Sequence, residues 1–242
     1  MAYLSGKDCA HLFVDGVDCA VSNNEVTITS EAVLVKRRPL GQAYKTAFLT
    51  GQVDSELTVA GWLDSVTQAQ LADLTNDAKV GSVLFGGNAV SQLFAGFKTL
   101  YVVGSKLGMS EDDLDTYEPV LMTSDCKANI GYVVAPYAAR TTAANTDATY
   151  ATMTETSAAT GRAFLHVAAL SLGGSTSCTI TVRHSSDHIT FTDHTAFANV
   201  TAVGAQTIEL ASTVNKYLSI SWAWNGAGSD QTISAFVGVA VD

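Results

Sequence analysis

The chain contains little charge, little proline and few basic residues. Only 15% of its 242 residues are charged and three are proline, while 47% are hydrophobic. This composition excludes a disordered chain and a proline-rich linker protein. Thirteen Lys and Arg against 23 Asp and Glu give a net charge of −10, which is the wrong sign for gripping a phosphate backbone. The sequence therefore indicates a folded, acidic protein that is not a dedicated nucleic-acid binder.

Long apolar runs and closely spaced cysteines are also missing. The longest apolar stretches, such as 164–172, are far shorter than the roughly 20 residues of a membrane helix. The N-terminal residues lack an export signal. Cys9, Cys19, Cys126 and Cys178 match neither a CxxC pair nor a compact disulfide framework. We expect no membrane span and buried free thiols made in a reducing cytoplasm, with a Cys9–Cys19 disulfide as the alternative.

Alternating apolar and polar residues predict antiparallel β structure in the first half of the chain. Val26 and Ile28, for example, fall on one face, with Thr and Ser on the other. Strands are expected at about 10–14, 24–37, 55–63, 80–85, 92–106 and 120–136. Residues 67–76 instead space Ala and Leu at helical intervals, with Ser65 or Thr67 as N-cap. This segment predicts one short helix packed on the sheet.

The composition changes after residue 137. Residues 138–160 are almost wholly Ala and Thr and predict a linker. Beyond it, short strands recur about every ten residues, at 164–172, 177–184, 189–192, 207–210, 217–224 and 232–241. The predicted protein is mainly β: a β-barrel or sandwich with one short helix in 1–137, then a linker, then a smaller β-sandwich in 161–242. Because few contacts are expected across a linker, residues 1–136 should assemble without the second domain.

Three histidines are the strongest candidates for metal ligands. His184, His188 and His194 stand beside Asp187 and Asp193, and imidazole and carboxylate suit zinc. If 179–184 and 189–192 form a hairpin, His184 and His188 flank its turn while His194 lies at the far end. We therefore expect solvated turn residues and no metal site.

Catalytic and cofactor motifs find no support. Ser185, His184 and Asp187 have the residue types of a nucleophilic triad, but neighbours on one turn do not form the required hydrogen-bond chain, and no GxSxG elbow is present. No glycine pattern that cradles phosphate follows a strand and opens a helix. We expect neither an enzyme nor a bound cofactor.

Trp222 and Trp224 allow two interpretations. Exposed on a sheet, they would form a platform for sugar rings. Strand alternation instead places them on one face with Leu218 and Ile220, which favours the apolar core.

Charge gathers in two segments of the first half. The basic residues Lys36, Arg37, Arg38 and Lys45 border a turn-rich segment, and the acidic residues Glu111, Asp112, Asp113 and Asp115 follow the strand expected to end near 106. Both segments fit solvated loops. The alternative is that they meet across a subunit boundary, where opposite charges set register more than they add affinity.

Local sequences in the two halves resemble those of phage structural proteins. Residues 8–136 resemble the tail tube proteins of long-tailed bacteriophages, a fold shared with type VI secretion tubes. The matching stretches are His11-Leu-Phe-Val-Asp-Gly-Val-Asp, Val26-Thr-Ile-Thr-Ser-Glu-Ala and Gln52-Val-Asp-Ser-Glu-Leu-Thr-Val-Ala-Gly-Trp-Leu-Asp. The second half resembles an accessory β-sandwich through Phe164-Leu-His-Val, Thr179-Ile-Thr-Val-Arg-His-Ser-Ser-Asp, Phe191-Thr-Asp and Lys216-Tyr-Leu-Ser-Ile-Ser-Trp. A small residue or glycine is usual in that family where His188 stands.

The resemblance implies a structural protein of the virion tail, made in the host cytoplasm. In this family subunits close into hexameric rings, each donating strands to a continuous barrel, and the rings stack into a tube that conducts DNA without specific binding. The implied partners are further copies of the chain, other tail proteins and a host surface glycan on the outer sandwich, with no membrane. The loop at about 38–52 would reach the next ring, which makes the two charged segments ring-stacking candidates. A capsid decoration protein and a carbohydrate-binding module are the alternatives.

Overall fold

The computed structural model describes residues 9–19, 23–37, 47–62, 78–85, 87–108, 116–123, 128–141, 146, 151–158 and 160–241. All regular secondary structure in these ranges is β-strand, which confirms the prediction of a mainly β protein. The helix expected at 67–76 lies outside the described residues.

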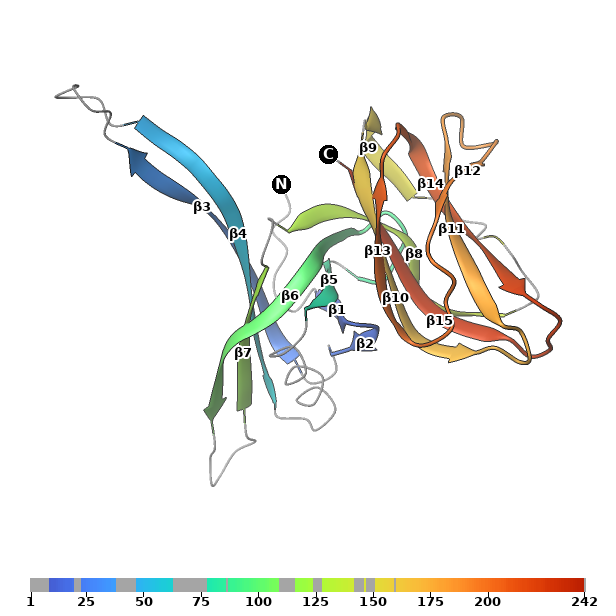
Figure 1. Ribbon diagram of the computed structural model, residues 1–242, viewed down its shortest axis with the longest axis horizontal. Helices are drawn as coiled ribbons and strands as arrows, with labels where there is room; N and C mark the ends of the chain where they lie inside the picture. Colours follow the sequence, from blue (N-terminus) through green and yellow to red (C-terminus); the bar gives the residue numbers. More distant parts are fainter. Residues whose placement is uncertain are drawn as a thin grey trace.

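Strands from both halves of the chain form one curled sheet, the main sheet (Figure 1). Its strands are β1 (Cys9–Val14), β2 (Val17–Asp18), β5 (Lys79–Phe85), β6 (Leu93–Gly108), β8 (Asn129–Thr141), β10 (Gly161–Ser171), β13 (Gly204–Leu210) and β15 (Thr232–Val241). They lie in the order β13-β10-β15-β8-β6-β5-β1-β2. The antiparallel pair β8–β15 joins the first half of the chain to the second.

Three further strands continue the same sheet from the distal part of β6 and form a branch, here called the arm sheet. These are β3 (Asn23–Arg37), β4 (Ala47–Trp62) and β7 (Thr116–Thr123). With the distal part of β6 they form an antiparallel sheet in the order β3-β4-β7-β6. Figure 1 shows the β3–β4 hairpin projecting well beyond the rest of the molecule.

The second half adds a four-stranded sheet, here the outer sheet. Its strands are β9 (Ala151–Ala158), β11 (Ser177–Ser185), β12 (Thr192–Ala196) and β14 (Val214–Asn225), in the order β12-β11-β14-β9. It faces the part of the main sheet made by β8, β15 and β10, and together they enclose an apolar core that includes Ile180, Leu218 and Trp222.

An aromatic cluster fills the inside of the curled main sheet. Phe13 stacks on Phe236 with ring centroids 5.5 Å apart, and Phe94 meets both Phe164 and Phe236 edge-on at 5.7 Å. All four rings are fully buried. Offset and edge-on packing of this kind contributes beyond simple area burial. Because two rings come from each half, neither half holds this core alone.

Strands β10 and β15 are therefore buried on both faces. In β10, Phe164 points into the aromatic cluster while Ala163 and Leu165 point into the core under the outer sheet. β15 repeats this arrangement with Phe236 between Ala235 and Val237. Burial on both faces explains why these strands read as nearly continuous apolar runs instead of alternating.

The segment predicted as a linker contains strand residues. The boundary expected after residue 137 falls inside β8, which continues to Thr141, and β9 occupies Ala151–Ala158. Both have partners, because β8 pairs with β15 and β9 pairs with β14. Ala and Thr are weak indicators of a strand by themselves, but the neighbouring strands supply the hydrogen bonds and the burial. The two-domain division stays a prediction.

Candidate functional site

The arm sheet has two free edges. Among the described strands, β3 pairs only with β4, and β6 beyond Leu100 pairs only with β7. These edges lie on opposite sides of the same sheet, because β4 and β7 stand between β3 and β6. Exposed apolar Val103, with 56% of its surface accessible, lies on the free part of β6. Unpaired strand edges template pairing with another chain, so both edges are candidate assembly surfaces.

The base of the arm sheet is fixed to the rest of the protein. Leu57, Val59 and Leu121 are fully buried in a core shared with β1, β5 and β6. The hydroxyl of Ser55 accepts a hydrogen bond from the backbone N–H of Ala128 at 2.9 Å. Packing and hydrogen bonding thus hold the arm sheet at one angle to the main sheet.

The two charged segments attach at opposite ends of the arm sheet. The chain leaves β3 at Arg37 and returns at Ala47, which are paired in the ladder at one end. It leaves β6 at Gly108 and returns at Thr116, which are paired at the other end beside Trp62. The backbone of Lys36 and Arg37 therefore lies at the end of β3. The other predicted stacking residues, Arg38, Lys45, Glu111, Asp112, Asp113 and Asp115, lie outside the described residues.

The turn Asp15-Gly16 joins the two ends of the main sheet. Gly16 N–H donates to Nδ1 of His166 at 3.3 Å, and Ala205 N–H donates to a carboxylate oxygen of Asp15 at 3.2 Å. Nδ1 of His166 is thus an acceptor, which leaves its Nε2–H to donate to the hydroxyl of Ser82 at 3.0 Å. Complete burial lowers the pKa of His166 to about 3, so this ring is neutral. Sequence analysis missed this residue because its partners are remote in the chain.

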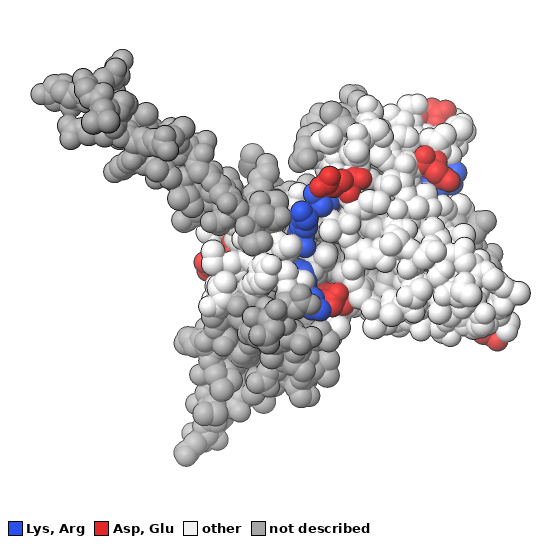
Figure 2. All heavy atoms as spheres, in the orientation of Figure 1, with Lys and Arg blue, Asp and Glu red and all other residues white. Residues whose placement is uncertain are grey.

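Charged side chains of the described residues are mostly paired. Lys79 lies 3.3 Å from Asp15, and Arg183 lies 3.0 Å from Asp193. Figure 2 shows basic and acidic atoms side by side along the junction between the arm side and the outer-sheet side, with wide uncharged areas elsewhere on that face. Such pairs contribute little stability at a surface, and they leave no basic patch among the described residues of this face for a phosphate backbone.

The predicted separation of His184 and His194 is wrong. Their rings meet edge to face with centroids 4.8 Å apart. The cause is the turn: Asp187 accepts hydrogen bonds from Ile189 N–H and Thr190 N–H, so β12 begins at Thr192 instead of 189. Among the described residues no group of three or more His, Cys, Asp or Glu is placed to hold a metal.

Ser185 and Asp187 do not form a catalytic relay with His184. The hydroxyl of Ser185 donates directly to Asp187 at 2.7 Å. Hydrogen bonds from Thr190 N–H, the Ser185 hydroxyl and Ile189 N–H lower the pKa of Asp187 to about 2. His184 accepts from Asn215 N–H instead. These groups stabilise a turn, and none of them activates the serine.

The core interpretation of Trp222 is confirmed. Its side chain is only 4% exposed, its indole N–H donates to Thr141 O at 3.3 Å, and the Arg140 guanidinium lies 5.7 Å from the ring. Trp224 is half-buried against the same core. Neither ring forms an open platform for a sugar.

Cys19 and Cys178 are buried thiols that form no disulfide, as predicted. Desolvation raises the pKa of Cys178 to about 11, so it is no nucleophile. The side chain of Cys9 and all of Cys126 lie outside the described part of the chain. No helix in the described ranges has the length and apolarity needed to span a bilayer.

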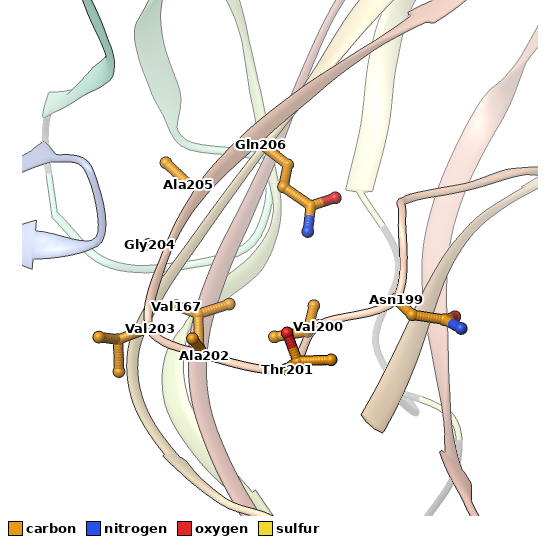
Figure 3. A pocket seen from close by; sticks show the side chains of 9 residues that line it. All are labelled: Val167, Asn199, Val200, Thr201, Ala202, Val203, Gly204, Ala205 and Gln206. Atoms are coloured by element: carbon orange, nitrogen blue, oxygen red, sulfur yellow. The ribbon is translucent and has the colours of Figure 1, made fainter. Parts of the chain in front are cut away.

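A small pocket of about 190 Å³ lies beside β13. Its walls are Val167 and the segment 199–206, with the side chains of Asn199, Thr201 and Gln206 as the polar groups (Figure 3). None of the lining residues is an acid or a base, so the pocket offers no proton-transfer chemistry.

Comparison with known proteins gives structural neighbours only. No protein-family model and no curated protein matches the sequence. The structural neighbours include chains of virus particles and of a contractile injection system. A chain from the virion of a native gene transfer agent particle has 13% identity and a TM-score of 0.42, over 54% of this chain and 98% of that one. A chain of an extracellular contractile injection system sheath-tube complex has 12% identity and a TM-score of 0.41, over 55% and 95%.

A third neighbour spans nearly the whole chain. The Dit protein of phage SPP1, described as a hub adsorption apparatus protein, covers 96% of this chain and 99% of its own length. Its identity is 10% and its TM-score 0.33. All three TM-scores lie below 0.5.

Proposed function

We propose that the chain is a structural protein of a phage tail, whose copies close into rings by joining the free edge of β6 in one copy to the free edge of β3 in the next. The observation that supports this is the pair of unpaired edges on opposite sides of one sheet. Opposite, different edges make a head-to-tail interface, which closes into a ring when the rotation between copies permits.

Strand direction is compatible with such joining. Each strand of the arm sheet is antiparallel to its neighbour in the order β3-β4-β7-β6, so β3 and β6 run in opposite directions. Placing β6 of one copy beside β3 of the next therefore continues an antiparallel ladder. Each copy adds four strands, and the closed barrel has no free edge. Six copies, as in the tail tube family, are the proposed ring.

The ends of the arm sheet suggest how rings stack. The basic segment that begins at Lys36 follows one end and the acidic segment at 111–115 follows the other. Rings that stack in one orientation bring unlike ends together. We therefore keep Lys36, Arg37, Arg38 and Lys45 as proposed partners of Glu111, Asp112, Asp113 and Asp115 in the next ring.

The stacked rings would conduct DNA in the virion tail, and the role is structural instead of catalytic. A chain with net charge −10 repels phosphate, which lets a duplex slide without binding. The outer sheet would lie on the outside of the tube, where other tail proteins or a host surface glycan are the proposed partners. Synthesis in the host cytoplasm precedes assembly.

Electron microscopy of the purified full-length protein tests this proposal. Val103→Lys places a charge on the free part of β6, and edge lysines oppose strand addition. Ile189→Lys is the matched control, because Ile189 is also exposed, at 78%, but lies in the β11–β12 turn. Wild type and Ile189→Lys should form rings or tubes, while Val103→Lys stays monomeric with unchanged circular dichroism. A wild-type protein that stays monomeric at high concentration, or a Val103→Lys variant that forms normal rings, contradicts the proposal.

A further inference from the structure

Two histidines of the outer sheet, His184 on β11 and His194 on β12, contact the segment 212–215. Nε2 of His194 lies 3.2 Å from the carbonyl oxygen of Ser212 and 3.1 Å from the hydroxyl of the same residue. Nδ1 of His194 is buried without a hydrogen-bond partner.

His184 has a contact that protonation would break. Its Nδ1 accepts the backbone N–H of Asn215 at 3.2 Å. Protonation at Nδ1 would turn the acceptor into a donor and set two N–H groups against each other. Burial and the neighbouring His194 both lower the pKa of His184, in the direction that this contact requires.

The surrounding charges do not compensate an imidazolium group at His184. On β12, Asp193 is bound to Arg183 of β11 at 3.0 Å. Asp187 is held within its own turn by Ser185 and two backbone N–H groups. Lys216 of β14, the next charged residue after Asn215, adds positive charge, and its Nζ lies 5.8 Å from the Tyr217 ring. No carboxylate of the described residues hydrogen-bonds to the His184 ring, which packs on the His194 ring with centroids 4.8 Å apart, so a positive charge on His184 would have no acidic partner among them.

β12 has few anchors in the outer sheet. It is a five-residue edge strand that pairs only with β11 among the described strands, and its residues are half-buried or exposed. The chain after it is firmly held, because Phe197 and Val200 are buried and bonded to the backbone of Ile180 and Cys178. Any opening therefore stops before Phe197.

We propose that acid opens the outer end of the β11–β12 hairpin, residues 186–196, by protonating His184, which can then no longer accept the N–H of Asn215. Near neutral pH, the two rings tie β11 and β12 to the segment 212–215 and close this edge of the outer sheet. In acid, β12 separates and the edge of β11 becomes available for strand addition. The proposed acid opening concerns the outer sheet alone and does not depend on ring formation by the arm sheet.

Amide hydrogen exchange of the full-length chain at pH 7.5 and pH 5, corrected for intrinsic rates, tests the proposal. Protection of the amides of 192–196 should fall at least about tenfold in acid. A tenfold fall corresponds to a difference of one pKa unit between the closed and the open hairpin. Protection of β10 should change far less.

The double variant His184→Asn, His194→Gln keeps an acceptor for Asn215 and a donor for Ser212 but does not titrate. It should therefore lose the pH dependence of protection. His188→Asn is the control and should behave as wild type, because His188 belongs to the same hairpin but its ring lies against Tyr217.

Two outcomes would overturn the proposal: unchanged protection of 192–196 between the two pH values, or a double variant with the same loss as wild type. The comparison of the wild-type protein at the two pH values tests the proposal even if the double variant does not fold. Raising the salt concentration at pH 5 screens the Coulombic effect of His194 on the pKa of His184, so protection should partly return. Acid opening that is insensitive to salt, or that is lost in His188→Asn, would also contradict the proposal.

Discussion

Gly16 marks the point where the two ends of the main sheet touch. Its φ is +85°, and a Cβ there would lie 2.5 Å from the carbonyl oxygen of Val167 and 2.7 Å from that of Gly204. Both contacts are with backbone, which cannot move aside as the end of a side chain can. The main sheet therefore closes only with glycine at this position.

The substitution Gly16→Ala should lower the free energy of unfolding by about 3 kcal/mol, of which roughly 1–2 is left-handed backbone strain. Gly87→Ala is the matched control, because Gly87 also has positive φ, +116°, but nothing lies within 4 Å of the place that a Cβ would occupy. The control should therefore show the strain alone. Chemical unfolding of both variants measures the difference, and equal losses would contradict the steric role of Gly16.

His166 makes stability depend on pH. Its pKa is about 3 in the folded protein and about 6.5 when unfolded. The unfolded state binds the extra proton between these values, so stability is complete above pH 6.5 and is lost as the pH falls toward 3. From pH 6.5 to pH 4 this group should remove roughly 3 kcal/mol.

The variant His166→Asn isolates that contribution. Asparagine does not titrate, so the variant should be less stable at neutral pH, through lost packing on Phe13, and should lose less stability on acidification. Unfolding free energies at several pH values for both proteins give the comparison. Identical pH slopes would exclude His166 as the source.

At the scale of elements, the proposed stacking pairs the basic segment after β3 with the acidic segment after β6 of the next ring. Arg37→Glu with Arg38→Glu should leave folding intact but shorten the tubes, because the reversed charges oppose stacking. Exposed pairs are worth only about 0–1 kcal/mol each, but every subunit of a ring repeats them. Tube-length distributions from electron microscopy provide the measurement.

Charge reversal on the acidic side tests whether the basic and acidic segments pair with each other. Adding Asp112→Lys and Asp113→Lys should restore part of the tube length, and high salt should shorten wild-type tubes. Polymerisation of the double reversal at wild-type length, or absence of rescue, rules out the charge pairing while leaving the edge pairing of β3 and β6 untouched.

At the scale of the whole molecule, the two halves share a sheet and an aromatic core. A fragment of residues 1–136 would lose β15, the neighbour of β8, and the rings of Phe164 and Phe236 that cover Phe13 and Phe94. Burial of one such ring is worth about 2–3 kcal/mol, a large fraction of a typical domain stability. This geometry argues against the independent assembly expected from the composition of 138–160.

We therefore expect the fragment 1–136 to be insoluble or unfolded, and the full-length chain to unfold in one transition. Circular dichroism and calorimetry of both proteins measure this. A folded fragment that forms rings would show that the first half needs neither β15 nor the aromatic rings of the second half.

The sequence alone determined the mainly β class, the approximate positions of strands such as β3 and β15, and the burial of Trp222. These depend on alternation along one segment, which sets which residues share a face. Alternation does not say which strand lies alongside. Tertiary structure alone decided that β8 pairs with β15, that His184 meets His194, and that the charged segments follow opposite ends of one sheet. Each of these depends on pairing between segments far apart in the chain or on the position of a turn. The pattern of apolar and polar residues along one segment carries neither kind of information.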